Sequence, residues 1–295
     1  MEEERFGRLV FIGGENGARY PNCNSLYIDD EVSAIIDPAS SETALKRLCG
    51  ERKLDVIVNT HYHEDHIGLN YLFPEADLYI HQDDAPCLKS LDTFMDYEDI
   101  TGTEFEQMWR SILVSEFHYA ERIPARELQD GDVVDFGHVK MEVIHTPGHT
   151  VGHSSFYFPD EGVLFMGDLD LSSFGPYYGS RDSDIDQTIE SMHRLLQVPA
   201  RVYITSHERG IVHNDIRELA EAYIRVIDER EQNLVAYLGE PRTFDEIVEQ
   251  WIIYKKPREP LDFYLFGERA MIKKHLEHLI GNGRVELQDK RYLLV

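Results

Sequence analysis

Cysteine, basic side chains and long apolar runs are all scarce in this sequence of 295 residues. The three cysteines, Cys23, Cys49 and Cys87, form no CxxC pair, which argues against a thiolate metal site and for a reducing compartment. No run approaches the roughly 18 consecutive apolar residues of a membrane-spanning helix, and the acidic first five residues are unlike a basic, apolar signal peptide. We therefore expect a cytoplasmic protein without a membrane partner.

Positive charge is in short supply, since 29 Lys and Arg face 55 Asp and Glu, for a net charge of −26. Long-range repulsion by such a chain disfavours nucleic acid, so the expected partner is a small-molecule substrate. Residues 240–295 carry ten charges of each sign, and the whole net charge therefore lies in residues 1–239. This break in composition predicts a domain boundary after Gly239, with a large domain over 1–239 and a small one over 240–295.

The apolar pattern predicts short strands that alternate with helices, and 42% hydrophobic residues suffice for a sizeable core. Strands are expected at 8–12, 25–28, 33–36, 54–59, 78–81, 133–136, 139–145, 154–158, 163–166 and 201–205. Helices are expected at 43–48, twice within 82–116, at 183–197 and from an Asn214 N-cap to Leu238. In the tail, helices near 244–251 and at 268–280 and a hairpin over 284–295 suggest a winged-helix-like unit.

The most informative string is His61-Tyr62-His63-Glu64-Asp65-His66, which directly follows the apolar strand expected at 54–59. We expect this HxHxDH string to form a loop that aims His61 and His63 to one side and Asp65 and His66 to the other. Imidazole nitrogens and carboxylate oxygens suit zinc, iron or manganese. One short loop could therefore supply ligands to two neighbouring metal ions.

Three further donors follow predicted strands: His149 after 139–145, Asp168 after 163–166 and His207 after 201–205. Strand ends are common positions for site residues, although each of these donors taken alone could mark an ordinary turn. Together with the HxHxDH string they complete two ligand sets. His153, four residues after His149, is expected to support the site rather than to bind metal.

In this order, Asp37, the HxHxDH string, His149, Asp168 and His207 resemble the five motifs of the metallo-β-lactamase superfamily. The resemblance implies an α/β fold, an αββα sandwich, here with the winged-helix-like appendage. It also implies two divalent metal ions, zinc first and iron or manganese as alternatives, and a metal-bridging hydroxide as the nucleophile. The resemblance implies one metal ion bound by His61, His63 and His149, a second bound by Asp65, His66 and His207, and Asp168 as the ligand that bridges them. It also implies that Asp37 is a buried residue that orients the ligand loop, and that Asp65 has a secondary catalytic role.

Within the superfamily, the presence of Asp168 and the lack of a cysteine near the ligands disfavour β-lactam hydrolysis. The 39 residues from Asp168 to His207 leave no room for the inserted domain of the superfamily's nucleases. The sequence most resembles glyoxalase II-like thioesterases and the human β-lactamase-like protein group, although Thr205-Ser206-His207-Glu208 stands where Pro-Gly-His-Gly is usual. The implied function is dinuclear metal-dependent hydrolysis of a thioester or other carboxylic ester. The alternatives are an endoribonuclease or phosphodiesterase of the same fold and a mononuclear iron persulfide dioxygenase.

Substrate contacts are expected from the loop after Asp168, where Tyr177, Tyr178 and Arg181 stand. Arg181 offers a fork for a carboxylate or phosphate, and the alternative is an ion pair with Asp182 or Asp184.

Residues 91–123 and the basic residues of the tail each allow two interpretations. The aromatic-rich residues 91–123 form either a lid over an apolar substrate, or packed helices or a homodimer contact. Basic residues of the tail suggest nucleic-acid binding, whereas the tail's zero net charge favours packing or substrate gating. These basic residues are Arg269, Lys273, Lys274, Arg284, Lys290 and Arg291.

Overall fold

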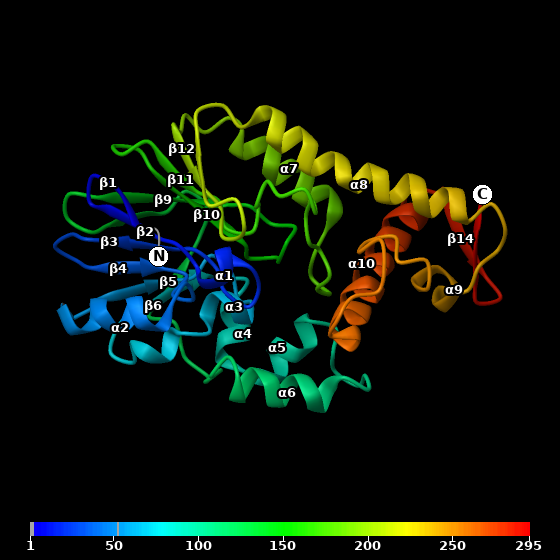
Figure 1. Ribbon diagram of the computed structural model, residues 1–295, viewed down its shortest axis with the longest axis horizontal. Coiled ribbons are helices and arrows are strands. Elements are labelled where there is room, and N and C mark those ends of the chain that lie inside the picture. The colour runs from blue at the N-terminus through cyan, green and yellow to red at the C-terminus, as the bar shows by residue number, and fades with distance from the viewer. Residues whose placement is uncertain (1–2, 52) are drawn as a thin grey trace.

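The computed structural model describes residues 3–51 and 53–295 and contains two mixed β-sheets packed face to face, with helices on both outer faces (Figure 1). The first sheet has seven strands in chain order, antiparallel from the first to the fourth and parallel from the fourth to the seventh. Its strands are β1 (Glu3–Phe6), β2 (Leu9–Ile12), β3 (Ser25–Ile28), β4 (Ala34–Ile36), β5 (Val56–Val58), β6 (Asp77–His81) and β7 (Arg126–Leu128).

The second sheet has six strands in the order β13-β12-β11-β10-β9-β8. The pair β11 and β12 is parallel and the other pairs are antiparallel. The strands are β8 (Val133–Asp135), β9 (Lys140–His145), β10 (Ser154–Phe158), β11 (Val163–Phe165), β12 (Val202–Ile204) and β13 (Ile211–His213).

Burial on both faces explains why several strands are apolar at every position. On β5, Val56 and Val58 belong to the core between the sheets, whereas Ile57 packs under the outer helices. On β11, Phe165 faces the inner core and Leu164 the opposite helices. Because successive side chains of a strand point to opposite faces, a strand buried on both sides needs an unbroken apolar run.

Helices complete the four layers, as the expected αββα sandwich requires. Against the first sheet pack α2 (Glu42–Glu51), α4 (Ala85–Lys89), α5 (Leu91–Tyr97) and α6 (Glu106–Ser115). Against the second sheet pack α7 (Ile185–Leu195) and α8 (Arg217–Tyr237). Two single-turn helices, α1 (Glu15–Ala18) and α3 (Glu64–Ile67), lie between strands of the first sheet in the sequence. Within the described residues, no helix has both the length and the apolar content needed to span a membrane.

The tail forms α9 (Phe244–Val248), α10 (Leu261–Gly281) and a hairpin of β14 (Val285–Gln288) and β15 (Arg291–Leu294). Its apolar side chains share one core cluster with Ile185 of α7 and with Ile227 and Leu234 of α8. The N-terminal end of α10 reaches back to α5 and α6 (Figure 1), where the Phe266 ring lies 6.1 Å from that of Trp109. The tail therefore packs against helices from both outer layers of the sandwich.

Four local predictions were wrong. Residues 82–116 contain three helices rather than two, because the extended backbone of Ser90 separates α4 from α5. Asn214 is not an N-cap, since its φ is 68° and α8 begins at Arg217. The tail's long helix begins at Leu261, well before the expected residue 268. The second half of the HxHxDH string is the helix α3 rather than a loop.

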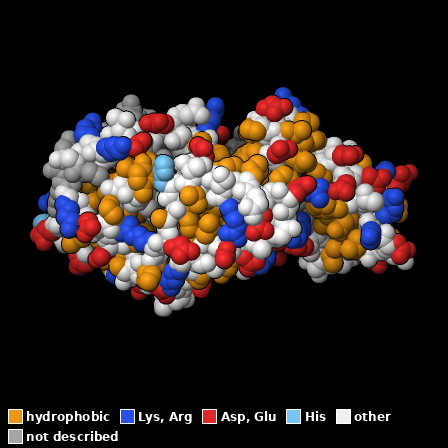
Figure 2. Space-filling view, turned by 90° about the horizontal axis from the view of Figure 1, so that it is seen from below, with side chains coloured by type: hydrophobic (Ala, Val, Ile, Leu, Met, Phe, Trp, Pro, Cys, Tyr) orange, Lys and Arg blue, Asp and Glu red, His pale blue; other side chains and the backbone are white. Residues whose placement is uncertain are grey.

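Figure 2 shows one face of the molecule, on which hydrophobic side chains lie in several separate groups among acidic and basic ones. Many exposed charges are paired across elements, as in the contact between Arg194 and Asp130. Such exposed pairs contribute little stability individually. The homodimer contact considered for residues 91–123 stays a prediction.

Candidate metal centre

Three buried histidines form a first donor cluster. His61 and His63 follow β5, and His149 lies on the loop between β9 and β10. The Nε2 atom of His149 lies 3.1 Å from Nε2 of His61 and 2.9 Å from Nδ1 of His63. Three imidazole nitrogens that face one another at this spacing form a group that can hold one metal ion.

A second donor cluster consists of Asp65, His66 and His207. Asp65 and His66 belong to α3, and His207 follows β12. Nε2 of His207 lies 3.3 Å from Nε2 of His66 and 3.4 Å from Oδ2 of Asp65. The single turn of α3 thus supplies Asp65 and His66 to the second cluster, while the ring centroid of His66 stays 4.0 Å from that of His61 in the first.

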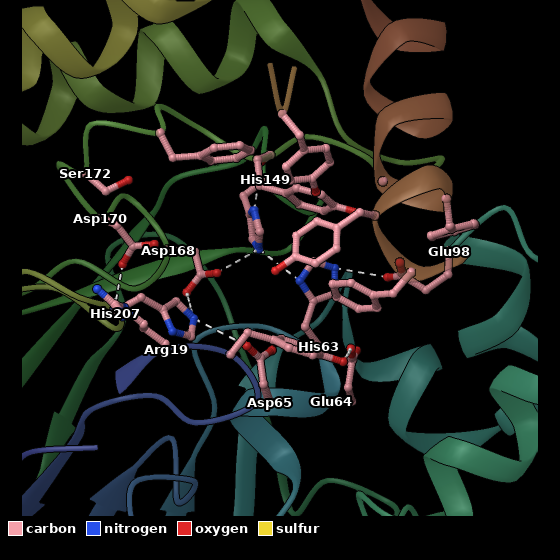
Figure 3. Close-up of a pocket in the computed structure, with 18 of the residues that line it drawn as sticks. Arg19, His63, Glu64, Asp65, Glu98, His149, Asp168, Asp170, Ser172 and His207 are labelled. Carbon is pink, nitrogen blue, oxygen red and sulfur yellow. Dashed lines mark hydrogen bonds and ion pairs between the residues drawn. The ribbon is translucent and has the colours of Figure 1, made fainter. Parts of the chain in front are cut away.

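Asp168 lies between the two clusters, as Figure 3 shows. Its Oδ2 is 3.3 Å from Nε2 of His149, and its Oδ1 is 3.0 Å from Nε2 of His66 and 3.4 Å from Nε2 of His207. Oδ1 is buried and has no hydrogen-bond partner among the described residues. Burial disfavours the charge on Asp168, but the neighbouring rings of His66 and His207 hold its pKa well below the usual range. An ionised carboxylate with an unsatisfied oxygen between two donor clusters fits a ligand shared by two metal ions.

Asp37 orients two of the histidines. Its Oδ1 accepts the backbone N–H of Thr60 at 2.8 Å, and its Oδ2 accepts the Thr60 hydroxyl at 2.7 Å and Nδ1–H of His66 at 3.0 Å. The same Thr60 oxygen lies 2.9 Å from Nδ1 of His61. Because Nδ1 of each ring is engaged, Nε2 of His61 and of His66 is directed to the clusters.

Backbone carbonyls orient two more of the rings. Nδ1 of His149 donates to the carbonyl of Tyr177 at 2.9 Å. Nδ1 of His207 donates to the carbonyls of Ala18 and Asn22 at 3.0 and 3.1 Å. Burial lowers the pKa of His149 to about 4, which favours the neutral ring that a metal ligand requires.

Glu98 is the carboxylate partner of His63 and was not expected from the sequence. Oε1 of Glu98 lies 3.0 Å from Nε2 of His63, and the Ser180 hydroxyl lies 3.1 Å from that nitrogen and donates to the same oxygen. Burial opposes the charge on His63, but Glu98 outweighs it and raises the pKa to about 9. No local signal in the sequence marks Glu98, since it stands at the end of α5 outside any recognisable motif.

His153 supports the centre, as the sequence predicted. It is fully buried, its Nδ1 donates to the carbonyl of Thr146 at 3.0 Å, and its Nε2 accepts the backbone N–H of Asp168 at 3.0 Å. Burial lowers its pKa to about 3, consistent with a neutral ring. Gly167 has a φ of +64°, and a Cβ there would lie 2.3 Å from Nε2 of His153. Only glycine therefore lets His153 hold Asp168 in this way.

The unusual sequence around His207 keeps the turn that it needs. Glu208 has a φ of 46°, in the left-handed region that glycine favours. Asn24 fixes the preceding residues, because its backbone N–H donates to the carbonyl of Ser206 at 2.7 Å and its side chain donates to that of Thr205 at 2.9 Å. Hydrogen bonds from Asn24 thus stabilise the turn around His207, although Glu208 stands where the usual string has its second glycine.

A cavity of about 660 Å³ opens onto the metal-ligand candidates His63, Asp65, His149, Asp168 and His207. Aromatic residues supply half of the remaining lining, and charged residues supply part of the rest. The aromatic lining residues are Tyr20, Phe94, Trp109, Phe174, Tyr177, Tyr254, Phe263, Tyr264 and Phe266.

Of the three predicted substrate residues, Tyr177 lines this cavity, and Tyr178 and Arg181 have other contacts. The fully buried Tyr178 hydroxyl lies 2.8 Å from Nε2 of His275 beneath the tail. Arg181 forms a two-pronged ion pair with Asp96 at 2.6 and 2.5 Å. Arg181 therefore forms an ion pair, which was the alternative to substrate binding, but its partner lies on α5 and is neither Asp182 nor Asp184.

A family model described as the metallo-beta-lactamase superfamily matches residues 19–207. Hydroxyacylglutathione hydrolase from Thermosynechococcus vestitus is 29% identical over 217 residues, which cover 68% of this chain and 71% of that protein. The enzyme of the same name from Nostoc sp. is 30% identical over 191 residues, 60% of each chain, so the match spans less than two thirds of its length.

Two solved structures are similar over nearly the whole chain. A metallo-beta-lactamase family protein from Thermus thermophilus has a TM-score of 0.74 at 24% identity and covers 98% of this chain and 99% of its own. A beta-lactamase domain protein from Burkholderia ambifaria has a TM-score of 0.70 at 19% identity, with coverage of 100% and 94%. The fold shared with these proteins therefore includes the tail.

Proposed function

This chain belongs to the metallo-β-lactamase superfamily, and we propose that it is a dinuclear metal-dependent hydrolase of thioesters or related carboxylic esters. The observation that carries the proposal is the pair of donor clusters joined by Asp168 at the wall of an aromatic cavity. The similarity to proteins named hydroxyacylglutathione hydrolase supports the same class of reaction.

The residues fit two metal ions, with His61, His63 and His149 at one, Asp65, His66 and His207 at the other, and Asp168 shared. Bound there, divalent metals would polarise the substrate carbonyl and lower the pKa of a water molecule toward neutrality.

The chain's own residues prepare this chemistry. Glu98 keeps a proton on Nε2 of His63, so that Nδ1 is the nitrogen available to bind a metal ion. In the net reaction, the oxygen of one water bonds to the carbonyl carbon. The carbon–sulfur bond breaks with its electron pair on sulfur, and the released protons pass to the thiol product and to solvent.

The cavity favours a large apolar or aromatic acyl group. Phe94 of α5, Trp109 of α6 and Phe266 of α10 line it together, and we call these three residues the aromatic wall. Burial of such surface contributes about 25 cal/mol per Å² of apolar area. A bulky acyl group therefore gains more from this wall than a short one.

Charge pairing of three of the six tail cations considered for nucleic-acid binding supports thioester hydrolysis over the endoribonuclease and phosphodiesterase alternatives. Arg269 pairs with Asp245 at 2.8 Å, and Arg291 pairs with Glu246 at 3.1 Å. Lys273 pairs with Asp99. Cations already neutralised within the chain release fewer counterions from a nucleic acid and add less to its binding.

We also keep two structural proposals. The helices α9 and α10 followed by the hairpin of β14 and β15 support a winged-helix-like description of residues 240–295. The division into 1–239 and 240–295 then separates a sandwich that carries the metal-ligand candidates from a unit that lines the cavity.

The test is hydrolysis of S-benzoyl-N-acetylcysteamine, an uncharged aromatic thioester, by zinc-loaded protein. We expect thiol release, loss of that release in Asp168→Asn, and no oxygen uptake with a persulfide. Oxygen consumption by protein that contains one iron would instead support the dioxygenase alternative and overturn the proposal. Cleavage of a short single-stranded RNA without thioester cleavage would also overturn it.

A further inference from the structure

A short basic segment stands out against the acidic chain. Lys255, Lys256 and Arg258, which we call the basic rim, carry three positive charges within four residues of a protein with a net charge of −26. All three side chains are exposed. In the part of the chain that the structure describes, none of them forms an ion pair or a side-chain hydrogen bond, unlike Arg269 and Lys273 farther along the tail.

Arg258 lines the same cavity as the metal-ligand candidates. Its guanidinium carbon lies 5.8 Å from the ring centroid of Tyr254 and 5.7 Å from that of Tyr264, and both rings also line the cavity. Contact with aromatic faces stabilises a guanidinium without using its N–H donors. Arg258 is therefore held at the cavity with its donors free for an anion.

The segment that leads to the basic rim is anchored to α10. The backbone N–H groups of Ile253 and Tyr254 both donate to the carboxylate of Glu268 at 3.0 Å. Gly267 lets the Tyr254 side chain pack against α10, because a Cβ at that position would lie 2.5 Å from the Tyr254 hydroxyl. The basic rim thus follows a fixed part of the backbone rather than a free tail.

We propose that the basic rim binds a phosphate-bearing thiol carrier, the leaving group of the thioester substrate. The proposal rests on the proposed function, which sets the thioester carbonyl at the metal-ligand candidates and the acyl group against the aromatic wall. The leaving thiol then extends toward Arg258. Three neighbouring cations match a group with several negative charges better than a single carboxylate, and guanidinium and phosphate pair through two parallel hydrogen bonds.

Binding of free thiols tests this inference without any hydrolysis. The probes are coenzyme A, which carries phosphates, pantetheine, which has the same thiol arm without them, and glutathione, which carries carboxylates. Isothermal titration calorimetry should show coenzyme A binding at least about tenfold more tightly than pantetheine or glutathione, with the advantage shrinking as salt is raised.

Variants assign that advantage to the basic rim. Arg258→Ala and the double variant Lys255→Ala with Lys256→Ala should each remove most of the affinity difference between coenzyme A and pantetheine. Arg258→Lys should retain part of this difference. The matched control is Arg225→Ala with Lys290→Ala, which removes the same charge as the double variant from two exposed residues outside the basic rim. This control should leave the advantage intact. For a benzoyl thioester of coenzyme A, Arg258→Ala should raise KM about tenfold and change kcat little.

Equal affinity for coenzyme A and pantetheine would overturn the inference, as would an equal loss in the control variant. Tighter binding of glutathione would also overturn it and indicate a carboxylate-bearing carrier. These failures are distinct from failure of the proposed function, because hydrolysis of the uncharged S-benzoyl-N-acetylcysteamine does not depend on the basic rim.

Discussion

At the scale of single residues, orientation distinguishes this centre from a simple collection of donors. Each of the five candidate histidines has one ring nitrogen in contact with a carboxylate, hydroxyl or carbonyl and presents the other to a cluster. Their partners come from segments far away in the sequence, such as Asp37 and Glu98. Ligands held in this way lose little freedom when a metal binds, which favours affinity.

Glu98→Gln tests the orientation of His63. The amide keeps the shape of the side chain but not the charge that holds a proton on Nε2 of His63, so we expect metal affinity to fall about 10- to 100-fold. Chelator competition measures this directly. Asp96→Asn is the control, because Asp96 lies on the same helix but pairs with the exposed Arg181. An equal effect of both substitutions would contradict a specific role for Glu98.

Asp84 ties the loop that carries His149 to the start of α4. Fully buried, it accepts the backbone N–H of Gly152 at 2.7 Å and the hydroxyl of Thr150 at 2.8 Å. Burial, with the nearby charge of Asp182, raises its pKa from an ordinary value of 3.8 to about 8. Between these values the folded protein holds a proton that the unfolded chain has lost, so stability falls as pH rises through this window.

Asp84→Asn should remove that pH dependence. An amide imitates the protonated carboxyl, donating to Thr150 and accepting from Gly152. The difference in free energy of unfolding between variant and parent should therefore shift in favour of the variant by more than about 1 kcal/mol as the pH rises from about 5 to about 8. Urea unfolding of both proteins at fixed metal content measures the difference. A constant difference across that range would show that Asp84 is ionised in the folded state.

The sequence was sufficient to find the metal-ligand candidates because they stand in one contiguous string and at the ends of apolar strands. Glu98 and Ser180 could not be found in this way, since their contact with His63 depends on how α5 and a distant loop pack. Arg181 was expected at the substrate but is paired with Asp96 of α5. Pairings between distant segments leave no local pattern.

At the scale of elements, the strands were easier to predict than the helix boundaries. Strands buried on both faces are unbroken apolar runs, whereas the short edge strands β1, β7 and β13 are partly charged or exposed and were missed. The start of α10 was missed because Pro260 gives no side-chain cap. The missed residues 261–267 include Phe263 and Phe266, so the wrong helix start left part of the cavity lining unpredicted.

Phe266→Ala and Trp109→Ala test the aromatic wall formed by α5, α6 and α10. Loss of either ring should lower kcat/KM for a benzoyl thioester about tenfold or more relative to an acetyl thioester, because the smaller acyl group gains less from apolar contact. Leu287→Ala, on the exposed hairpin, is the control. Equal losses for both substrates would mean that the wall serves packing rather than acyl binding.

At the scale of the whole molecule, the tail is both part of the core and part of the cavity. Its apolar residues cluster with Ile227 and Leu234 of α8, and Tyr254 and Phe266 line the cavity with the metal-ligand candidates. The break in charge after residue 239 therefore marks a change in composition, while apolar packing and the cavity continue across it.

A chain that ends at residue 239 should consequently not fold normally. The truncation uncovers the apolar faces of α7 and α8, so we expect aggregation or loss of a cooperative thermal transition. Circular dichroism during heating, compared with the full chain, is the measurement. A soluble truncated protein that melts cooperatively near the parent temperature would show that the sandwich is independent of the tail.

Metal content tests the central claim of two neighbouring metal sites most directly. Elemental analysis of the zinc-loaded protein should give about two metal ions per chain, and about one in either His149→Ala or His207→Ala, because each substitution removes a ligand of one cluster only. Circular dichroism should show that both variants remain folded. One metal per wild-type chain, or the loss of both metals in one folded variant and of none in the other, would contradict the account.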